Sequence, residues 1–401
     1  MSGVSYMDKL LNDVAVEWKP LGTLAEIYGG LTGKSKSDFD GGNAKYVSYK
    51  NIFANINVDF SSLESVKVSA TENQHEVKYG DILFTGSSET ADEAGMSSAV
   101  TTHFEEAVFL NSFSFGVRFN KEIPISSEFS KYLFRTSFMR SEIAKTASGV
   151  TRFNVSKERF KKILVPILSP DDPKKSLEIQ AEIVRILDNF TELTTELTTE
   201  LTTELTTRKK QYNYYRDQLL SFEGGVPFKR LGEIVRIKNG KDHKTLGDGE
   251  FPVYGSGGIM RYADTYAYNK PSVLIPRKGT LGNLFFLDVP FWNVDTIFYT
   301  EIDETQILPK FLYYFLTTVG LGEMNQAGGV PSQTQSVLNA LKIPVPPIKV
   351  QSEIVAILDK FDALTNSITE GLPREIELRQ KQYAHYRDLL LSFPKSEKVE
   401  A

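Results

Sequence analysis

Apolar side chains recur every three or four residues in two separate parts of the chain. In the first part the row consists of Ile183, Ile186, Leu187, Phe190, Leu193, Leu197, Leu201 and Leu205, and in the second it consists of Ile354, Ile357, Leu358, Phe361 and Leu364. This spacing predicts one apolar face on each of two α-helices. Each helical segment runs for about 40 residues, or roughly 60 Å at 1.5 Å per residue. We expect the two helices to bury their apolar rows against each other as a coiled coil; two separate surface helices are the alternative.

The two helical segments are copies of one another. The stretch "EIVRILDNF" (182–190) returns as "EIVAILDKF" (353–361), and "RKKQYNYYRDQLLSF" (208–222) returns within "LRQKQYAHYRDLLLSF" (378–393), both displaced by 171 residues. At this displacement Tyr212, Tyr215 and Arg216 correspond to Tyr383, Tyr386 and Arg387. An internal repeat of this length indicates a pseudo-two-fold duplication.

The segments between the helices barely resemble each other and have mixed patterns. "GDILFTG" (80–86) and "PSVLIPRKG" (271–279) predict strands that end in glycine turns, whereas "FSKYLFRTSFMRSEI" (129–143) and "KFLYYFLTTVGLGEM" (310–324) predict helices. Weaker repeats relate "ASGV" (147–150) to "AGGV" (327–330) and "PLGTLAEI" (20–27) to "RLGEIVRI" (230–237). We therefore predict an α+β protein with a leader (1–16), two mixed α/β domains (17–167 and 227–346) and two helical segments (168–226 and 347–401).

The first helical segment contains four end-to-end copies of one unit, "TELTTELTTELTTELTT" (191–207). Low complexity is typical of disorder, but a step of four residues is close to one helical turn, and the flanking apolar rows favour a helix. Thr is a mediocre helix former, so these turns are expected to depend on packing. In the second segment, Gly371 and Pro373 should bend or break the helix.

Composition narrows the possible functions. The chain has 401 residues, no Cys, and four scattered His, so thiolate metal sites are excluded and no ligand-like His spacing exists. No apolar run approaches the length of a membrane span, about 18 residues, and the first residues do not resemble a signal peptide, so we expect a cytoplasmic protein with no membrane partner. The net charge of −5 disfavours a general nucleic-acid binder, yet residues 229–244 carry six Lys/Arg against two acids, and residues 152–162 carry five against one.

Two stretches resemble functional motifs and fail on inspection. "GGLTGKS" (29–35) lacks the first glycine of a phosphate-binding loop, because Tyr28 stands at that position. "SSETADEAG" (87–95) holds three acids without a Lys or His at useful spacing, and is interpreted as a solvated loop. With no cofactor loop and no amino-methyltransferase motif of the Asn-Pro-Pro type, the chain is predicted to be non-catalytic and to bind no cofactor or metal itself.

Basic, glycine-rich loops remain as candidates for binding DNA. Glycine lets a backbone approach a ligand closely, Arg and Lys can contact phosphates and guanine, and Asn and Ser can contact base edges. The candidate DNA-binding residues are Lys34, Lys36, Arg152, Asn154 and Lys157 in the first domain and Lys241, Lys244, Tyr254, Ser256, Arg277, Lys278 and Thr280 in the second. Solvated turns with a few charges are the alternative interpretation.

Taken together, the duplicated helical motifs, the Val-Pro pair that ends each mixed block (165–166 and 345–346) and the four-residue repeat resemble the DNA-specificity subunit of type I restriction–modification systems. The similarity covers essentially the whole chain, and the repeat resembles the branch with short Thr-x-x-Leu-type units. The chain differs from many relatives around Gln180 and Gln351, where those have Glu-Gln at the helix start.

The resemblance implies that each mixed domain recognises one half of a split site in double-stranded DNA. It also implies that the helices pack antiparallel as a spacer that docks two modification (methyltransferase) subunits, which bring S-adenosylmethionine. Restriction subunits, which use ATP and Mg²⁺ for motor and nuclease activity, would then join. The residues expected to serve packing or docking are the apolar rows up to Leu205 and Phe361, together with Tyr212, Tyr215, Arg216, Tyr383, Tyr386 and Arg387.

The repeated unit then suggests a ruler. One extra unit lengthens a helix by about 6 Å and turns its end by about 40°, while one base pair advances about 3.4 Å and turns about 36°. We therefore expect the number of units to set the gap between half-sites; a repeat without any metric role is the alternative. A coiled-coil scaffold whose domains bind protein or carbohydrate, and a self-sufficient DNA enzyme, are the competing classes of function.

Overall fold

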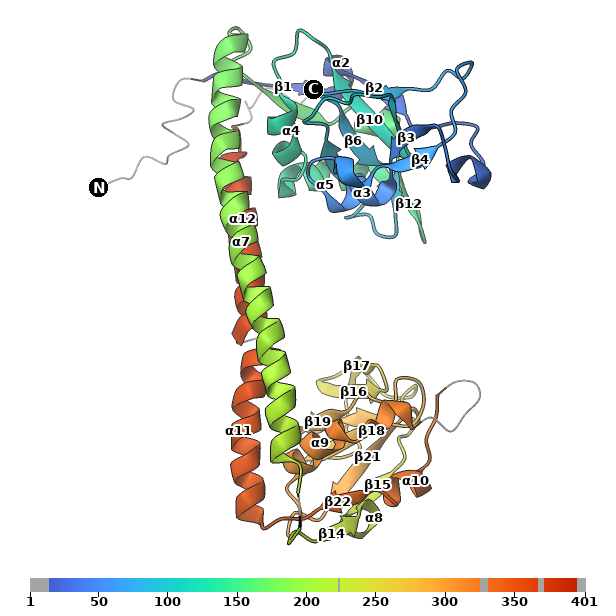
Figure 1. Cartoon of the computed structure of the whole chain (residues 1–401), viewed down its shortest axis with the longest axis vertical. Coiled ribbons are helices and arrows are strands. Elements are labelled where there is room, and N and C mark those ends of the chain that lie inside the picture. Colours follow the sequence, from blue (N-terminus) through green and yellow to red (C-terminus); the bar gives the residue numbers. More distant parts are fainter. Residues whose placement is uncertain (1–13, 223, 325–330, 367–370, 395–401) are drawn as a thin grey trace, which may run out of the picture. The chain divides into compact units, whose positions relative to one another are not determined.

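The computed structural model describes residues 14–222, 224–324, 331–366 and 371–394. The chain divides into two compact units, Met1–Thr198 with Leu378–Ala401, and Thr199–Glu377 (Figure 1). One end of each long helical region belongs to each unit, so every unit contains a mixed α/β domain and a pair of helical segments.

The domain of the first unit is built on a four-stranded antiparallel sheet in the order β2-β10-β6-β8. Its strands are β1 (Val16–Pro20), β2 (Ala25–Gly29), β3 (Ala44–Val47), β4 (Glu64–Val66), β5 (Glu76–Val77), β6 (Ile82–Thr85), β7 (Ser87–Ser88), β8 (Ser97–Ala99), β9 (Val108–Leu110), β10 (Ser114–Phe119), β11 (Ala147–Ser148), β12 (Phe153–Val155) and β13 (Leu164–Leu168). Its helices are α2 (Leu21–Leu24), α3 (Tyr49–Ala54), α4 (Ser127–Leu133), α5 (Ser137–Thr146) and α6 (Lys157–Phe160).

The domain of the second unit repeats this plan with a sheet in the order β15-β21-β18-β19. Its strands are β14 (Phe228–Arg230), β15 (Val235–Lys238), β16 (Phe251–Gly255), β17 (Gly258–Ala263), β18 (Ser272–Pro276), β19 (Phe285–Leu287), β20 (Trp292–Asn293), β21 (Ile297–Ile302) and β22 (Lys342–Pro344). Its helices are α8 (Leu231–Ile234), α9 (Pro309–Thr318) and α10 (Gln335–Asn339). The four strands of the two central sheets correspond one to one.

Both domains are closed by pairing of their first and last strands. In the first, β1 lies antiparallel to β13, and Trp18 faces Pro166; in the second, β14 lies antiparallel to β22, and Lys229 faces Ile343. The chain thus enters and leaves each domain at one place. This arrangement lets a helix follow directly after each domain.

The strands predicted at residues 80–86 and 271–279 are confirmed as β6 and β18, both buried. The helix predicted over 129–143 is two helices, because the hydroxyl of Thr136 accepts a hydrogen bond from the Met139 N–H and starts α5 anew. The helix predicted over 310–324 ends at Thr318, since Gly320 adopts a left-handed conformation with φ 70°. Local capping therefore overrode the apolar periodicity at both places.

The first helical segment is one continuous helix, α7 (Pro173–Leu219), of 47 residues. The disordered interpretation of the four-residue repeat is therefore wrong. Several threonines bond to their own helix, as when the hydroxyls of Thr203 and Thr206 donate to the carbonyl groups of Thr199 and Thr202. These bonds satisfy the hydroxyls without any need for a second chain.

The second segment is divided into α11 (Ile348–Asn366) and α12 (Gly371–Leu390), so the interruption predicted from Gly371 is confirmed. Gly371 has φ +74°, and a Cβ there would lie 2.6 Å from the carbonyl oxygen of Leu364. Only glycine fits that position without strain. Pro373 follows in the first turn of α12, where a missing N–H costs nothing.

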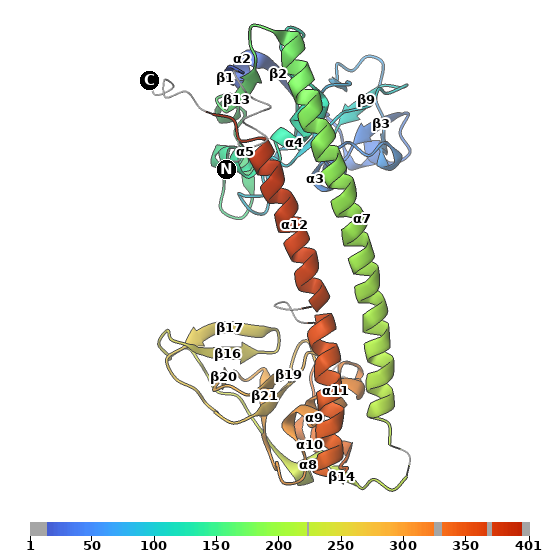
Figure 2. The same ribbon diagram turned by 90° about the vertical axis from the view of Figure 1, so that its left-hand side faces the viewer.

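Within each unit the helical segments lie side by side and run antiparallel (Figure 2). In the first unit, the ring of Phe190 stacks on Tyr386 at 5.6 Å, and in the second, Tyr215 stacks on Phe361 at 5.7 Å. These two contacts are equivalent under the displacement of 171 residues. The duplicated sequence therefore forms a duplicated packing arrangement.

Candidate nucleic-acid interface

In the first domain, the β11–β12 hairpin brings Arg152 next to the segment that follows β6. Strand β12 pairs with β7, so that Phe153 lies opposite Ser88. A concavity of about 270 Å³ at this place is lined by Tyr49, Ser87, Ser88, Glu89, Phe113 and Arg152. The Phe113 ring is 64% exposed. An exposed aromatic ring, a guanidinium and a carboxylate in one concave surface suit contact with base edges.

Two other predicted residues of this domain are exposed near its basic surface. Asn154 lies on β12, and Lys157 begins α6, where Ser156 caps the helix. The ammonium group of Lys157 lies 5.8 Å from the centre of the Phe115 ring. Lys36 is exposed in a short 3-10 helix, Lys36–Phe39. All three can reach solvent and thus a phosphate backbone.

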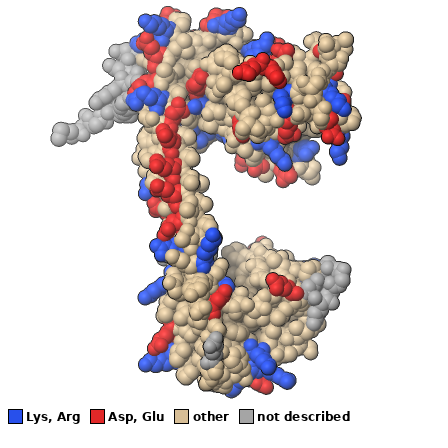
Figure 3. Space-filling view, in the orientation of Figure 1, with Lys and Arg blue, Asp and Glu red and all other residues tan. Residues whose placement is uncertain are grey.

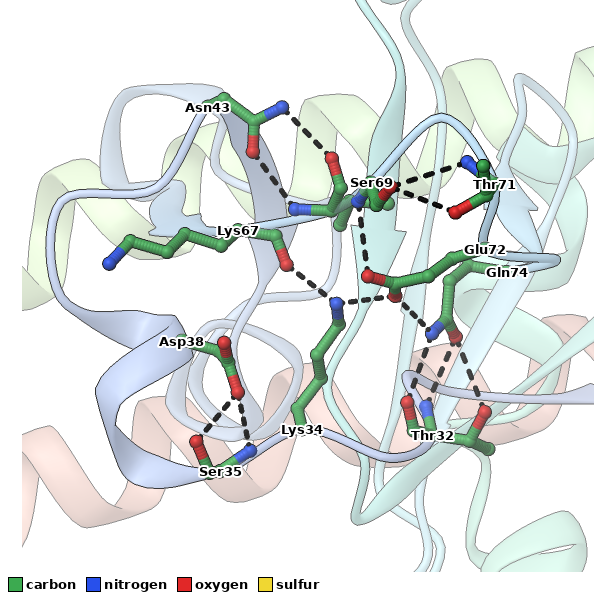
Figure 4. A network of polar contacts seen from close by, with 11 residues as sticks. Thr32, Lys34, Ser35, Asp38, Asn43, Lys67, Ser69, Thr71, Glu72 and Gln74 are labelled. Carbon is green, nitrogen blue, oxygen red and sulfur yellow. Dashed lines mark hydrogen bonds and ion pairs between the residues drawn. The ribbon is translucent and has the colours of Figure 1, made fainter.

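Lys34 requires a correction, because its side chain is engaged within the domain (Figure 4). Its ammonium group donates to a carboxylate oxygen of Glu72 and, at 2.6 Å, to the carbonyl oxygen of Lys67, and only 4% of the side chain is exposed. The hydrogen bond from Lys34 is the main reason why the pKa of Glu72 falls to about 2. Lys34 therefore holds a loop together and is not presented to a ligand.

In the second domain, several predicted residues converge on Thr296. The Ser256 N–H donates to the Thr296 hydroxyl at 3.3 Å, and the N–H groups of Arg277 and Lys278 both donate to its carbonyl oxygen. The Asn283 amide donates to the Ser256 carbonyl at 3.1 Å. Lys278 and Thr280 are exposed, and these backbone bonds hold their loop in one place.

Tyr254 lies half-buried beside this loop, with its ring 5.3 Å from Phe285. Burial raises the pKa of the Tyr254 phenol, which therefore stays protonated and can donate a hydrogen bond. Lys241 and Lys244 are exposed on the adjoining loop. That loop is fixed because the Lys241 N–H donates to Asn293 and the Trp292 indole donates to the Lys241 carbonyl.

The two candidate surfaces occupy corresponding places in the two domains. Each follows the equivalent central strand, β6 or β18, and each meets a segment from the end of its domain. In the first domain that segment is β12, and in the second it is Ser332, which forms a β-bridge with Lys278. The repeat predicted at 327–330 lies outside the described residues, but its neighbour Ser332 corresponds to Arg152 at the same displacement of 180.

Sequence reasoning missed the residues that complete these surfaces. The loop from 87 to 95 was interpreted as solvated, yet Ser87, Ser88 and Glu89 line the concavity with Arg152. Phe113 and Tyr49 come from other loops, and no local pattern marks them. The available signal was position, since 87–95 follows β6 just as the predicted loop 276–283 follows β18.

The predicted spacer residues fall into two groups. Ile183, Leu187, Tyr212, Ile354 and Leu358 are buried in the cores that each unit shares with its domain. Leu193 (51%), Tyr215 (47%), Ile357 (42%) and Tyr386 (38%) remain substantially exposed. The half-buried remainder consists of Ile186, Phe190, Leu197, Leu201, Leu205, Phe361, Tyr383, Arg216 and Arg387. The arginines are bound by their neighbours, Asp217 and Asp388.

Charge separates the helices from the loops. Figure 3 shows acidic side chains in a row along α7, where the repeated unit places Glu192, Glu196, Glu200 and Glu204. Among the residues that the structure describes, no three acidic or His side chains gather as metal ligands would. Within the same residues, no helix is both long and apolar enough to cross a membrane.

Comparison with known proteins agrees with this arrangement of two domains and a helical pair. Residues 14–207 and 223–378 match the family model of the type I restriction modification DNA specificity domain. The chain belongs to the family of type I restriction–modification specificity subunits.

Individual relatives match over nearly their whole length. The chain is 35% identical over 438 aligned positions to the EcoR124I/EcoR124II specificity subunit of Escherichia coli, with 100% of both chains covered. It is 36% identical to the EcoprrI specificity subunit of the same organism, covering 92% of this chain and 93% of the relative. A chain in a solved structure described as "Structural basis underlying complex assembly and conformational transition of the type I R-M system" aligns with a TM-score of 0.62 at 16% identity, covering 94% and 97%. That structural likeness concerns the fold.

Proposed function

We propose that this chain is a non-catalytic subunit that directs a type I restriction–modification complex to a split, asymmetric DNA sequence. The observation that carries the proposal is the pair of domains with sheets of the same strand order and different loops. Equivalent scaffolds place the two candidate surfaces in equivalent positions, whereas Arg152, Glu89 and Phe113 on one have no counterparts in Lys278, Ser256 and Tyr254 on the other. Two different surfaces would read two different half-sites.

The duplicated helical segments would serve as spacer and docking surface. Equivalent contacts, such as Phe190 with Tyr386 and Phe361 with Tyr215, would present similar surfaces to two copies of one modification subunit. The exposed apolar side chains Leu193, Ile357 and Leu389 support docking on these helices. The modification subunits would supply S-adenosylmethionine, and restriction subunits would supply ATP-driven movement and cleavage.

The four-residue repeat would set the distance between the half-sites. The unbroken α7 and its self-satisfied threonines support this role, because a unit can be added without leaving a hydroxyl unpaired. We place the chain in the cytoplasm, where the DNA is.

The test is to co-express the chain with its modification subunits in a host free of adenine methylation and to map methylated adenines across the genome. One split, asymmetric motif is the expected result, and it would identify both half-sites and the gap. A stable complex without new methylation would contradict the proposal and favour a scaffold that binds protein or carbohydrate.

A further inference from the structure

Each domain is fastened to its helix by the same two polar side chains. They are Gln180 and Asp188 on α7 and Gln351 and Asp359 on α11, at the displacement of 171 residues that relates the repeats. Glutamine and aspartate are separated by eight residues, or about two helical turns. The duplication has therefore preserved a pair of contact points in each unit.

The glutamines bind the backbone where a domain helix begins. The side-chain oxygen of Gln180 accepts a hydrogen bond from the N–H of Ser126 at 2.9 Å, and its amide donates to the carbonyl of Pro124. The oxygen of Gln351 accepts from the N–H of Leu308 at 2.7 Å, and its amide donates to the carbonyl of Pro346 at 2.7 Å.

Ser126 and Leu308 are the N-cap residues of α4 and α9. Gln180 is 1% exposed and Gln351 is fully buried. Both bonds of each carboxamide are needed there, since a glutamate would lack the donor. The glutamines thus fix the position of the first turn of each domain helix.

The aspartates hold the same domain helices further along. Asp188 accepts hydrogen bonds from the Tyr132 hydroxyl at 2.6 Å and from the Lys131 ammonium group at 2.8 Å. Asp359 accepts from the Tyr314 hydroxyl at 2.5 Å and from the Lys310 ammonium group at 2.8 Å. In both units the tyrosine and lysine come from α4 or α9. Burial, followed by the hydrogen bond to the aspartate, raises the pKa of both phenols, so the tyrosines remain donors.

The second helical segment of each unit completes the arrangement with an aromatic contact. The Phe393 ring lies 6.1 Å from Phe129 on α4, and the Phe222 ring lies 6.3 Å from Phe311 on α9. Phe222 and Phe393 also correspond at the displacement of 171. Each domain helix is therefore received by two antiparallel helical segments, with polar contacts from one and an apolar contact from the other.

We propose that Gln180 with Asp188, and Gln351 with Asp359, are positioning residues that fix the angle of each recognition domain on its helix and so restrict the accepted gap between half-sites. A single contact would leave a pivot, whereas two contacts two turns apart fix both position and rotation. This inference rests on the proposed function. It adds a second determinant of the gap besides the length of the repeat.

The test compares methylation of DNA duplexes that carry both half-sites at the preferred gap, or at a gap one base pair shorter or longer. The variants are Asp188→Ala and Asp359→Ala in the complete complex with modification subunits. Side chains of Asp188 and Asp359 are 50% and 35% exposed, so folding should persist. Glu178→Ala and Glu353→Ala are the matched controls, because each removes an exposed carboxylate from the same helix.

For each aspartate variant, methylation at the altered gaps relative to the preferred gap should rise about tenfold, which corresponds to about 1.4 kcal/mol, while the bases required in each half-site stay the same. The controls should behave like the unaltered chain. Methylation that falls by one factor at every gap, with unchanged ratios, would show a merely structural role and overturn the inference. If the unaltered complex methylates no split site, the proposed function itself fails and the inference fails with it.

Gln351→Met provides a second measurement that does not depend on DNA. Hydrogen exchange of the Leu308 amide should accelerate in this variant, while exchange in the β18 strand stays unchanged. Equal acceleration in both places would indicate general destabilisation and count against the positioning role.

Discussion

The phenol oxygen of Tyr383 in α12 lies 2.9 Å from the hydroxyl oxygen of Thr191 in α7, although 192 positions separate the two residues. The Thr191 hydroxyl also lies 3.1 Å from the Tyr132 hydroxyl, which binds Asp188. A chain of hydroxyls thus connects both helical segments with the domain of the first unit. Tyr383 belongs to the repeated motif, so its structural task is encoded in the duplicated sequence.

Replacing Tyr383 with Phe should lower the free energy of unfolding of the first unit by about 1 kcal/mol, the usual net value of one hydrogen bond. The ring and its packing remain, so no cavity forms. Urea denaturation followed by fluorescence measures the change. Tyr214→Phe is the control, because Tyr214 is 62% exposed, and its stability should match that of the unaltered chain.

The bond between Lys34 and Glu72 should make stability depend on pH. The pKa of Glu72 is about 2 in the folded protein against an ordinary value of 4.5, so folding favours the carboxylate. Its stabilising contribution is present above about pH 4.5 and is lost as the pH falls towards 2.

Glu72→Gln should therefore lower the melting temperature at pH 7 and have little effect near pH 2. Melting curves recorded between these values measure the difference. A difference that stayed constant over the whole range would contradict the ion pair.

Arg152→Ala should weaken DNA binding and reduce the slope of log K against log salt by about 1, because one phosphate-range cation is removed. If Arg152 reads guanine instead, discrimination at one position of one half-site should fall by about 1–3 kcal/mol. Titration of the complete complex with duplexes at several salt concentrations distinguishes these outcomes.

Lys121→Ala is the matched control for charge. Lys121 is exposed just beyond Phe119, at the far end of β10 from Phe113, which lines the concavity with Arg152. This control should leave the salt slope unchanged. An equal reduction in both variants would mean that only the total charge of the domain matters.

Deleting one repeat unit, residues 198–201, should shorten the accepted gap by about one base pair, since a four-residue step turns a helix by about 40° and a base pair turns DNA by about 36°. Both half-site sequences should persist. Adenine methylation mapped across the genome measures the gap. Replacing the same four residues with alanine keeps the length and should keep the gap; a shortened gap in that control would assign the effect to side chains.

The helical segments and their duplication could be predicted because their signals are local or repeated. The apolar spacing of Ile183, Leu187 and Phe190 follows from helix geometry, and the match of Tyr212 to Tyr383 needs only comparison of the chain with itself. The central strands β6 and β18 were evident from their apolar, β-branched cores. The helix boundaries near Thr136 and Gly320 were missed because one cap or one left-handed residue outweighs a periodic pattern.

The candidate site depended on contacts between distant segments. Nothing near Lys34 in sequence shows that Glu72, 38 positions away, neutralises it. Likewise Phe113 and Ser87 meet Arg152 only because β12 pairs with β7.

The sequence by itself determined the duplicated plan, the two helical segments, the interruption at Gly371 and the class of protein. Only the tertiary structure decided which basic side chains remain available to a ligand, and that Gln180 and Asp188 hold a domain in place. The physical reason is range. Helical periodicity and glycine conformation act within a few residues, whereas a hydrogen bond or an ion pair depends on which distant groups the folded chain brings within about 3 Å.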